Sequence, residues 1–223
     1  MDIRFANFLK YIIRHYHLET PKIILIFGCG SNNENTSIKQ IINPESFTIG
    51  IDIDFLSLVK NQYKKNLLQM NGSQLGFKDD LFDCVFSYHA LEHITDYSGA
   101  LENIKRVLKP NSFFLLGVPN KRRILGYIGS KTTLYKKIQW NINDLRMKCK
   151  GKFENRYGAH AGFTKKELSL LLNKYFVQVE DVTVQYYVNC YPSKEKLLKI
   201  LDKFGPDELV FPSLYYLCFK ECK

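Results

Sequence analysis

Short, mainly apolar segments alternate with amphipathic segments along the first half of the chain. An apolar run with few polar positions predicts a strand buried on both faces, as in a parallel sheet covered by helices. Five such strands are predicted, at residues 23–27, 47–53, 66–70, 82–86 and 112–118. Apolar residues at helical spacing predict helices at 3–16, 54–64 and 97–108. This alternation indicates an α/β fold with a doubly wound parallel sheet.

The second half of the chain departs from this rhythm. Residues 121–160 carry few strand signals, and residues 32–43 predict a loop with a short helix. Thr164 and Glu167 have the spacing of a capping box and predict the start of a helix. Further on, a strand is predicted in the β-rich run 176–188, a helix at 194–204 and a last strand at 214–219.

The composition predicts a single domain that folds on its own. The chain has 223 residues, and 45% of them are apolar. Its six cysteines include no Cys-x-x-Cys pair, so neither a disulfide framework nor a metal site is expected. The sequence also shows no secretory signal and no apolar run long enough to span a membrane. These features predict a cytoplasmic protein.

The net charge of +10 is concentrated in one segment. Residues 121–156 hold eleven basic side chains and two acidic ones, whereas the rest of the chain is close to neutral. A local excess of this kind predicts a local anionic partner, and the alternative is a solvated basic surface.

A glycine pair follows the first predicted strand. Gly28 and Gly30 have no Cβ, so a ligand can approach the backbone there closely. Asp52 lies at the end of the second strand, 22 residues after Gly30, where a carboxylate can accept hydrogen bonds from a ribose. A nucleoside-containing cofactor is therefore expected. A nicotinamide dinucleotide is less favoured, because the third glycine of its fingerprint is missing.

Polar side chains follow the strand at 82–86: Ser87, Tyr88, His89, Glu92 and His93. In open α/β sheets, ligands bind beyond the carboxyl ends of the strands. These residues are therefore placed for chemistry, and the alternative is a helix cap with two solvated histidines.

Two motifs in this part of the chain carry a resemblance to a known family. Residues 75–93 read LGFKDDLFDCVFSYHALEH, and residues 106–112 read RVLKPNS. With the glycine pair and Asp52, they make residues 22–120 resemble class I S-adenosylmethionine-dependent methyltransferases of the type 11-like group. The resemblance implies a Rossmann-like sheet of seven mostly parallel strands, with the last strand antiparallel. It also implies S-adenosylmethionine as the cofactor.

The resemblance implies roles for individual residues. Gly28 and Gly30 would contact the methionine part of the cofactor, Asp52 the ribose, and Asn71 the region of the adenine. The full set of implied cofactor contacts is Phe27, Gly28, Gly30, Asp52, Ile53, Asn71, Gly72, Ser87 and His89. Two positions depart from the family pattern: Ile26 replaces an acid and Asn32 replaces a third glycine.

Methyl transfer to a hydroxyl requires a base, and His89, His93 and His160 are the candidates. His160 is preferred, because it lies in the small-residue stretch 158–163 just before the capped helix. A structural or substrate-positioning role for His160 is the alternative. The predicted catalytic residues are His160, His89 and Tyr88.

The basic segment occupies a region that often covers the substrate in this family. We therefore expect O-methylation of a small anionic acceptor, such as a nucleotide-activated sugar, a surface-glycan precursor or a phosphorylated metabolite. Residues 121–162 also look similar to methyltransferases of bacterial polysaccharide biosynthesis. The predicted substrate-binding residues are Arg122, Arg123, Lys136, Arg156 and His160. An RNA-directed methyltransferase and a non-catalytic cofactor-binding protein remain as alternatives.

These expectations divide the single domain into four parts. Residues 1–20 form an N-terminal helix, 22–120 the cofactor-binding core, 121–162 the basic substrate cover and 163–223 the C-terminal part of the sheet.

Overall fold

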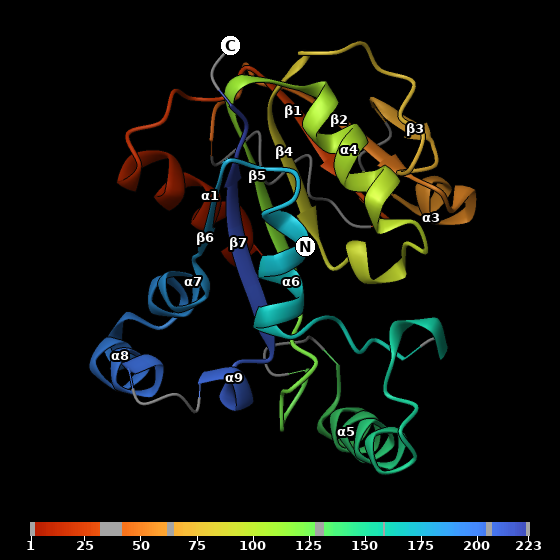
Figure 1. The fold of residues 1–223 in the computed structure, drawn as a ribbon, viewed down its shortest axis with the longest axis vertical. Coiled ribbons are helices and arrows are strands. Elements are labelled where there is room, and N and C mark those ends of the chain that lie inside the picture. The colour runs from red at the N-terminus through yellow and green to blue at the C-terminus, as the bar shows by residue number, and fades with distance from the viewer. Residues whose placement is uncertain are drawn as a thin grey trace.

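The computed structural model describes residues 3–31, 42–61, 65–127, 132–157, 159–203 and 207–221. Most of the predicted loop and helix at 32–43 lies outside these residues. Figure 1 shows one twisted sheet with helices on both faces and one helix, α5 (Leu134–Cys149), beyond the lower end of the sheet. No helix of the described part is both long enough and apolar enough to cross a membrane.

Seven strands form the sheet, in the order β3-β2-β1-β4-β5-β7-β6. Strands β1 to β5 are mutually parallel, and β7 runs antiparallel to both β5 and β6. The predicted fold class is confirmed, including the antiparallel last strand. The strands are β1 (Ile23–Phe27), β2 (Phe47–Asp52), β3 (Leu67–Gln69), β4 (Phe82–Tyr88), β5 (Leu108–Pro119), β6 (Gln178–Asp181) and β7 (Ser213–Phe219).

Two apolar clusters bury the two faces of the sheet. One cluster contains side chains of α4 (Tyr97–Val107) and α6 (Lys165–Leu172). The other contains side chains of α1 (Ile3–His15), α3 (Phe55–Lys60) and α7 (Thr183–Cys190). In Figure 1, α4 and α6 lie in front of the sheet and α1 lies behind it. The carboxyl ends of β1, β2 and β4 meet at the edge of the sheet that faces α5.

The β-rich run at 176–188 contains a strand, as predicted, but the strand covers only part of the run. Strand β6 ends at Asp181, and helix α7 begins at Thr183. The ring of Tyr186 stacks on Tyr215 of β7, with ring centroids 3.7 Å apart. Aromatic and β-branched residues favour strands in isolation, but here tertiary packing on the sheet favours a helix.

Several boundaries also differ from the prediction. Strand β4 continues through Ser87 and Tyr88, and β5 begins at Leu108, four residues earlier than expected. The basic segment contains the 16-residue helix α5, and the helix predicted at 194–204 is α8 (Glu195–Lys203). Three short 3₁₀ segments, η1 (Leu91–His93), η2 (Asn155–Tyr157) and η3 (Pro192–Lys194), and the short helix α9 (Asp207–Val210) were not predicted.

Asp83 of β4 links this strand to the start of β1 and to β5. Its carboxylate accepts hydrogen bonds from the backbone N–H of Lys22 and of Ile23, and from the Lys109 ammonium at 2.6 Å. Burial alone would raise the pKa of Asp83, but these donors hold it below its ordinary value. We therefore expect Asp83 to stabilise the fold above its unfolded pKa, with the stabilisation lost as pH falls through the lower folded pKa.

Replacement of Asp83 by Asn should thus lower the free energy of unfolding at pH 7, and the deficit against the wild type should shrink below about pH 4. Urea unfolding at several pH values measures this difference. Asp79→Asn is the matched control, because that exposed carboxylate pairs with Arg106 at the surface and such pairs contribute little. A deficit that stays constant down to pH 3 would contradict the assigned cause.

Helix α6 begins with the predicted capping box. The Thr164 hydroxyl accepts from the backbone N–H of Glu167 at 3.1 Å, and the Glu167 carboxylate accepts from that of Thr164 at 2.8 Å. Thr164→Ala should lower the free energy of unfolding by about 1 kcal/mol. Thr164→Ser keeps the oxygen and should stay near the wild type in the same denaturant titration. Equal losses in the two variants would mean that the hydroxyl is not the cause.

Candidate active site

The glycine loop after β1 has the backbone geometry that its sequence predicts. Gly28 and Gly30 both have positive φ, at 74° and 50°. A Cβ added to Gly28 would lie 2.2 Å from the Cβ of Ala90, so the loop packs directly against the segment after β4. The Gly28 N–H donates to the carbonyl of Ile51 at 2.9 Å. The loop is thereby fixed to the end of β2.

Asp52, the last residue of β2, lies against this loop, and the space beside them is the predicted cofactor crevice. Its Oδ2 accepts from the Gly30 N–H at 2.7 Å and its Oδ1 from the Asp54 N–H at 2.9 Å. Asn61 donates to the Gly30 carbonyl at 2.8 Å and holds the loop from the other side. Each carboxylate oxygen still has a lone pair for a ligand hydroxyl. The loop and Asp52 therefore fit the ribose end of a nucleoside cofactor.

Other residues that are predicted to contact the cofactor also lie at this edge of the sheet. A Cβ at Gly72 would lie 2.3 Å from the ring of Phe27, so this glycine lets the ring pack against the backbone. The amide oxygen of Asn71 accepts from the Ser73 N–H at 3.0 Å, and Ile53 is exposed. Their roles toward a cofactor stay predictions.

Ile26 and Asn32 are the two positions that depart from the family pattern, and the structure describes only the first. Ile26 is fully buried in the cluster on the α1 side of the sheet, so its side chain serves packing there. Asn32 lies outside the described residues.

Ser87, Tyr88 and His89 lie at the end of β4, and the rings of Tyr88 and His89 stack with centroids 4.3 Å apart. Ser87 is buried, and its hydroxyl has no hydrogen-bond partner among the described residues. The Tyr88 ring packs against Phe5 of α1, with centroids 4.8 Å apart. The His89 Nε2 lies 3.0 Å from the hydroxyl of Ser213, the first residue of β7. Burial lowers the pKa of His89 to about 3, with the nearby Arg123 charge adding to the shift. His89 is therefore neutral at pH 7.

The most unusual group of side chains at this edge is a cluster of Glu92, His93 and His160. The His93 and His160 rings meet edge to face, with centroids 4.7 Å apart. The His93 Nε2 lies 3.9 Å from Oε1 of Glu92, whose side chain is fully buried. Burial raises the pKa of Glu92 to about 8, against the opposing charge of Arg123. Burial and then His160 lower the pKa of His93, whereas Asp52 opposes this shift. The cluster therefore adjoins the predicted cofactor crevice.

Arg123 fixes the segment that carries His160. It is 3% exposed, and it donates to the carbonyls of His160 and Ala161 at 2.9 and 3.1 Å and to Asp144 of α5 at 2.8 Å. Because these bonds direct its guanidinium toward protein groups, Arg123 holds the insert against the edge of the sheet. Its predicted contact with substrate is not tested by this geometry.

The other predicted substrate-binding residues lie on exposed parts of segment 121–162. Arg122 pairs with Glu208 of α9 at 2.6 Å, and Lys136 and Arg156 are exposed. Lys121 pairs with Glu154 and Glu167. Part of the local positive charge is thus neutralised within the protein, and four further basic residues, Lys136, Lys137, Arg146 and Lys148, lie on α5.

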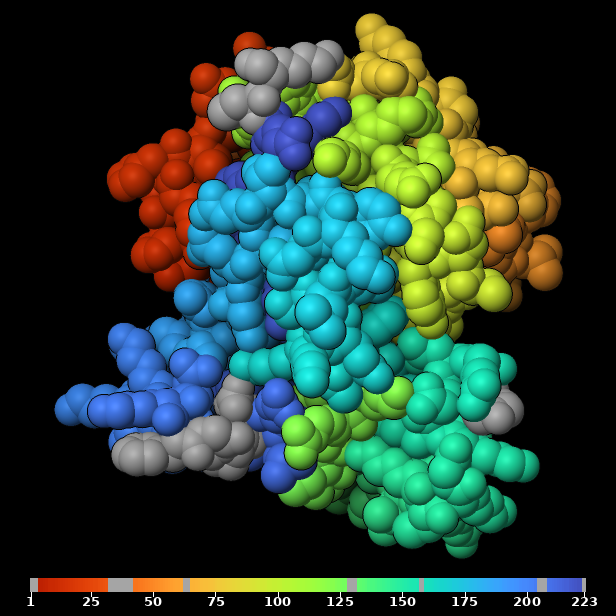
Figure 2. All heavy atoms as spheres, viewed as in Figure 1, coloured from red at the N-terminus to blue at the C-terminus, as the bar shows by residue number. Residues whose placement is uncertain are grey.

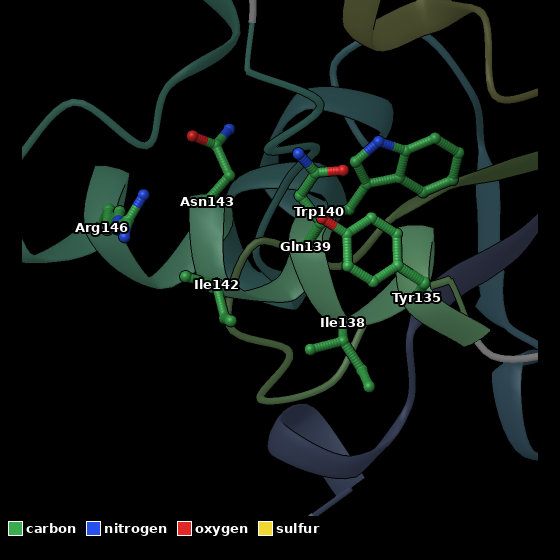
Figure 3. Close-up of a pocket in the computed structure, with 7 residues that line it drawn as sticks. All are labelled: Tyr135, Ile138, Gln139, Trp140, Ile142, Asn143 and Arg146. Carbon is green, nitrogen blue, oxygen red and sulfur yellow. The ribbon is translucent and has the colours of Figure 1, made fainter. Parts of the chain in front are cut away.

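Helix α5 exposes apolar side chains as well as basic ones. Figure 3 shows a shallow hollow lined by Tyr135, Ile138, Gln139, Trp140, Ile142, Asn143 and Arg146, all from this helix. In the space-filling view of Figure 2, residues of α5 form part of a lobe below the body of the sheet. The hollow includes none of the predicted site residues.

Two features were not predicted from the sequence: the ion pair between Arg123 and Asp144, and the proximity of Glu92 to His160. Glu92 and His160 are far apart in the chain, and no local pattern marks them as neighbours. The pair Glu92-His93, shortly after the buried strand β4, was the one available signal.

Comparison with known proteins agrees with this architecture. Residues 25–116 match the family model described as a methyltransferase domain. A demethylmenaquinone methyltransferase of Oceanobacillus iheyensis is 24% identical over 79% of this chain and 79% of its own length. An O-methyltransferase of Aspergillus nomiae, rstn1, is 31% identical over 44% of this chain, which spans about half (49%) of that protein.

A solved structure supports the fold. The plantazolicin methyltransferase BpumL, in complex with S-adenosylhomocysteine and a substrate analogue, superposes with a TM-score of 0.66. The superposition covers 98% of this chain and 84% of BpumL, at 16% sequence identity. The sheet order, the glycine loop and Asp52 agree with this domain match, which supports a class I S-adenosylmethionine-dependent methyltransferase domain at residues 25–116.

Proposed function

We propose that the chain methylates a hydroxyl oxygen of a small acceptor that binds between the carboxyl edge of the sheet and segment 121–162. One observation carries this proposal: the cofactor crevice and the pair His93 and His160 lie at the same edge. Gly28 packs against Ala90, the carbonyl of Ala90 accepts from the His93 N–H at 3.0 Å, and the His93 ring contacts His160. An acceptor beside this pair would also lie beside the predicted cofactor site.

The chemistry requires little more than correct placement. S-adenosylmethionine supplies an electrophilic methyl group when bound, and an enzyme accelerates its displacement mainly by aligning donor and acceptor. The protein groups proposed to hold the cofactor are the backbone at Gly28 and Gly30 and the carboxylate of Asp52. The pair His93 and His160 contacts the acceptor hydroxyl and assists loss of its proton.

We propose a phosphate-bearing or otherwise acidic acceptor, because exposed basic residues remain on segment 121–162. Lys136 of α5 is such a residue, whereas Arg122 and Lys121 are paired with carboxylates. Nucleotide-activated sugars, surface-glycan precursors and phosphorylated metabolites have this character. The polysaccharide association and the cytoplasmic location stay predictions.

A second candidate is methylation of an apolar aromatic acceptor. The relative from Oceanobacillus iheyensis is named for demethylmenaquinone. Exposed apolar side chains on α5, among them Leu134, Tyr135 and Ile138, would suit such a molecule. This acceptor would take the methyl group on carbon or on oxygen without needing the basic residues of the insert.

A methyl-transfer screen with the full chain separates these candidates. Three substrate pools are incubated with S-adenosylmethionine and scored by a mass gain of one methyl group: nucleotide sugars with phosphorylated metabolites, quinols with other phenols, and RNA. The proposal expects a product from the first pool and loss of that product with His160→Ala. Product from the second or third pool alone would contradict the acidic small-molecule acceptor. No product and no cofactor binding would contradict the enzyme itself.

A further inference from the structure

Glu92 is a buried carboxylate that lacks the contacts such a group normally has. The residue is 3% exposed, and neither carboxylate oxygen has a hydrogen-bond partner among the described residues. Burial disfavours the charged form of such a group, and a donor or a cation beside it stabilises that form. The fold places this group beside the crevice, where a ligand could supply what the protein does not.

Two imidazoles meet the carboxylate at that point. One ligand atom from each of Glu92, His93 and His160 can be chosen so that all three lie within 4.8 Å of one another. Around a tetrahedrally coordinated ion with ion–ligand distances of about 2.1 Å, neighbouring ligand atoms lie about 3.4 Å apart. Because His93 and His160 are exposed, small rotations of their rings can close this difference without moving the core.

The backbone around these side chains is well fixed. His93 and Glu92 belong to the 3₁₀ segment η1, and the His93 N–H donates to the Ala90 carbonyl at 3.0 Å. The His160 carbonyl is held by Arg123, and Gly162 exchanges two hydrogen bonds with the Asn155 side chain. The three side chains therefore come from two segments that are each anchored independently of any ligand.

We propose that Glu92, His93 and His160 bind a divalent transition-metal ion at the mouth of the cofactor crevice. Two imidazoles and one carboxylate form the donor set of catalytic zinc sites and of other open sites for first-row metals. Three protein ligands leave at least one coordination position for water or for an acceptor oxygen. The ion would also favour the charged form of the buried Glu92 carboxyl group.

The role of this ion rests on the proposed function, although its binding does not. A hydroxyl bound to a divalent ion is more acidic than a free hydroxyl, and its oxygen is held in one place. With the ion bound, His93 and His160 act as its ligands in place of the direct role in proton loss proposed above, and solvent takes the proton that the bound hydroxyl releases. This assignment favours an oxygen acceptor over a ring carbon.

Metal binding is tested on the full chain without cofactor or acceptor. After dialysis against a chelator, the protein is titrated with Co²⁺ and Zn²⁺, and visible absorption and calorimetry report the stoichiometry and affinity. We expect one equivalent of Co²⁺ with ligand-field bands, displaced by Zn²⁺. Glu92→Gln and His160→Ala should each weaken binding at least about tenfold. His15→Ala, which removes an exposed histidine on α1, is the matched control and should bind like the wild type.

The outcomes separate this inference from the proposed function. The inference is overturned if the folded wild type binds no saturable equivalent, or if Glu92→Gln and His160→Ala bind Co²⁺ as the wild type does. Circular dichroism of each variant confirms that the fold is intact. Methyl transfer that persists in chelator, without metal binding, would leave the methyltransferase standing and overturn the metal site. Tight metal binding with no methyl transfer in any pool would support the metal site and contradict the proposed function.

Discussion

Replacement of Asp52 by Ala is expected to weaken binding of S-adenosylhomocysteine by at least about tenfold. Hydrogen bonds to a charged group contribute about 1.5–3 kcal/mol each, which corresponds to about 10- to 150-fold in affinity. The variant would lose the proposed ribose contact, and it would also release the Gly30 N–H that Asp52 now accepts at 2.7 Å. Both effects act on the same crevice. Calorimetric titration of the two proteins measures the difference.

Asp54→Asn is the matched control for this experiment. Asp54 lies two residues further on, and its side chain caps α3 by accepting from the Leu56 N–H at 3.0 Å. Asn caps helices as well as Asp does, so neither stability nor affinity should change much. Equal losses in the two variants would indicate a general charge effect. Unchanged affinity in Asp52→Ala would remove Asp52 from the cofactor site.

Replacement of Arg123 by Ala is expected to lower the free energy of unfolding by about 3–5 kcal/mol, because it leaves Asp144 buried without its partner. It also removes the donors to His160 and Ala161. If Arg123 positions His160, catalytic turnover should fall more than cofactor affinity, since the crevice at Asp52 does not include Arg123. Denaturant unfolding and steady-state kinetics report the two effects.

The neighbouring arginine provides the comparison. Arg122 is half-exposed and pairs with Glu208 at the surface, so Arg122→Ala should cost less than about 1 kcal/mol. The double variant Arg123→Met with Asp144→Leu removes both charges, and it should recover much of the stability that Arg123→Ala loses. Recovery of stability without recovery of turnover would support a positioning role. If Arg123→Ala alone were as stable as the wild type, the stabilising role of the buried ion pair would be contradicted.

The core of the sheet could be predicted because its signals are local. The run at 23–27, the glycine pair and Asp52 each carry their meaning within a few residues, and β1 matches its predicted bounds. The capping box of α6 is a similar case. Parallel strands covered on both faces leave apolar runs that a sequence shows directly.

The parts that escaped prediction depend on contacts between distant residues. The segment at 183–190 has the composition of a strand, yet it folds as α7 because Tyr186 packs on Tyr215. In the sequence, Arg123 is one of several basic residues in segment 121–162. In the fold, it donates to Asp144 and to the carbonyl of His160, which are distant in the chain. Sequence spacing holds no information about such pairs. The cluster of Glu92 and His160 was missed for the same reason.

The central claim is that the glycine loop and Asp52 hold S-adenosylmethionine at the carboxyl edge of the sheet. Calorimetric titration of the full chain with S-adenosylhomocysteine tests it most directly. We predict saturable binding of one equivalent, lost or strongly weakened in Asp52→Ala and retained in Asp54→Asn. The absence of saturable binding at ligand concentrations up to about 1 mM, in protein that is folded, would contradict it.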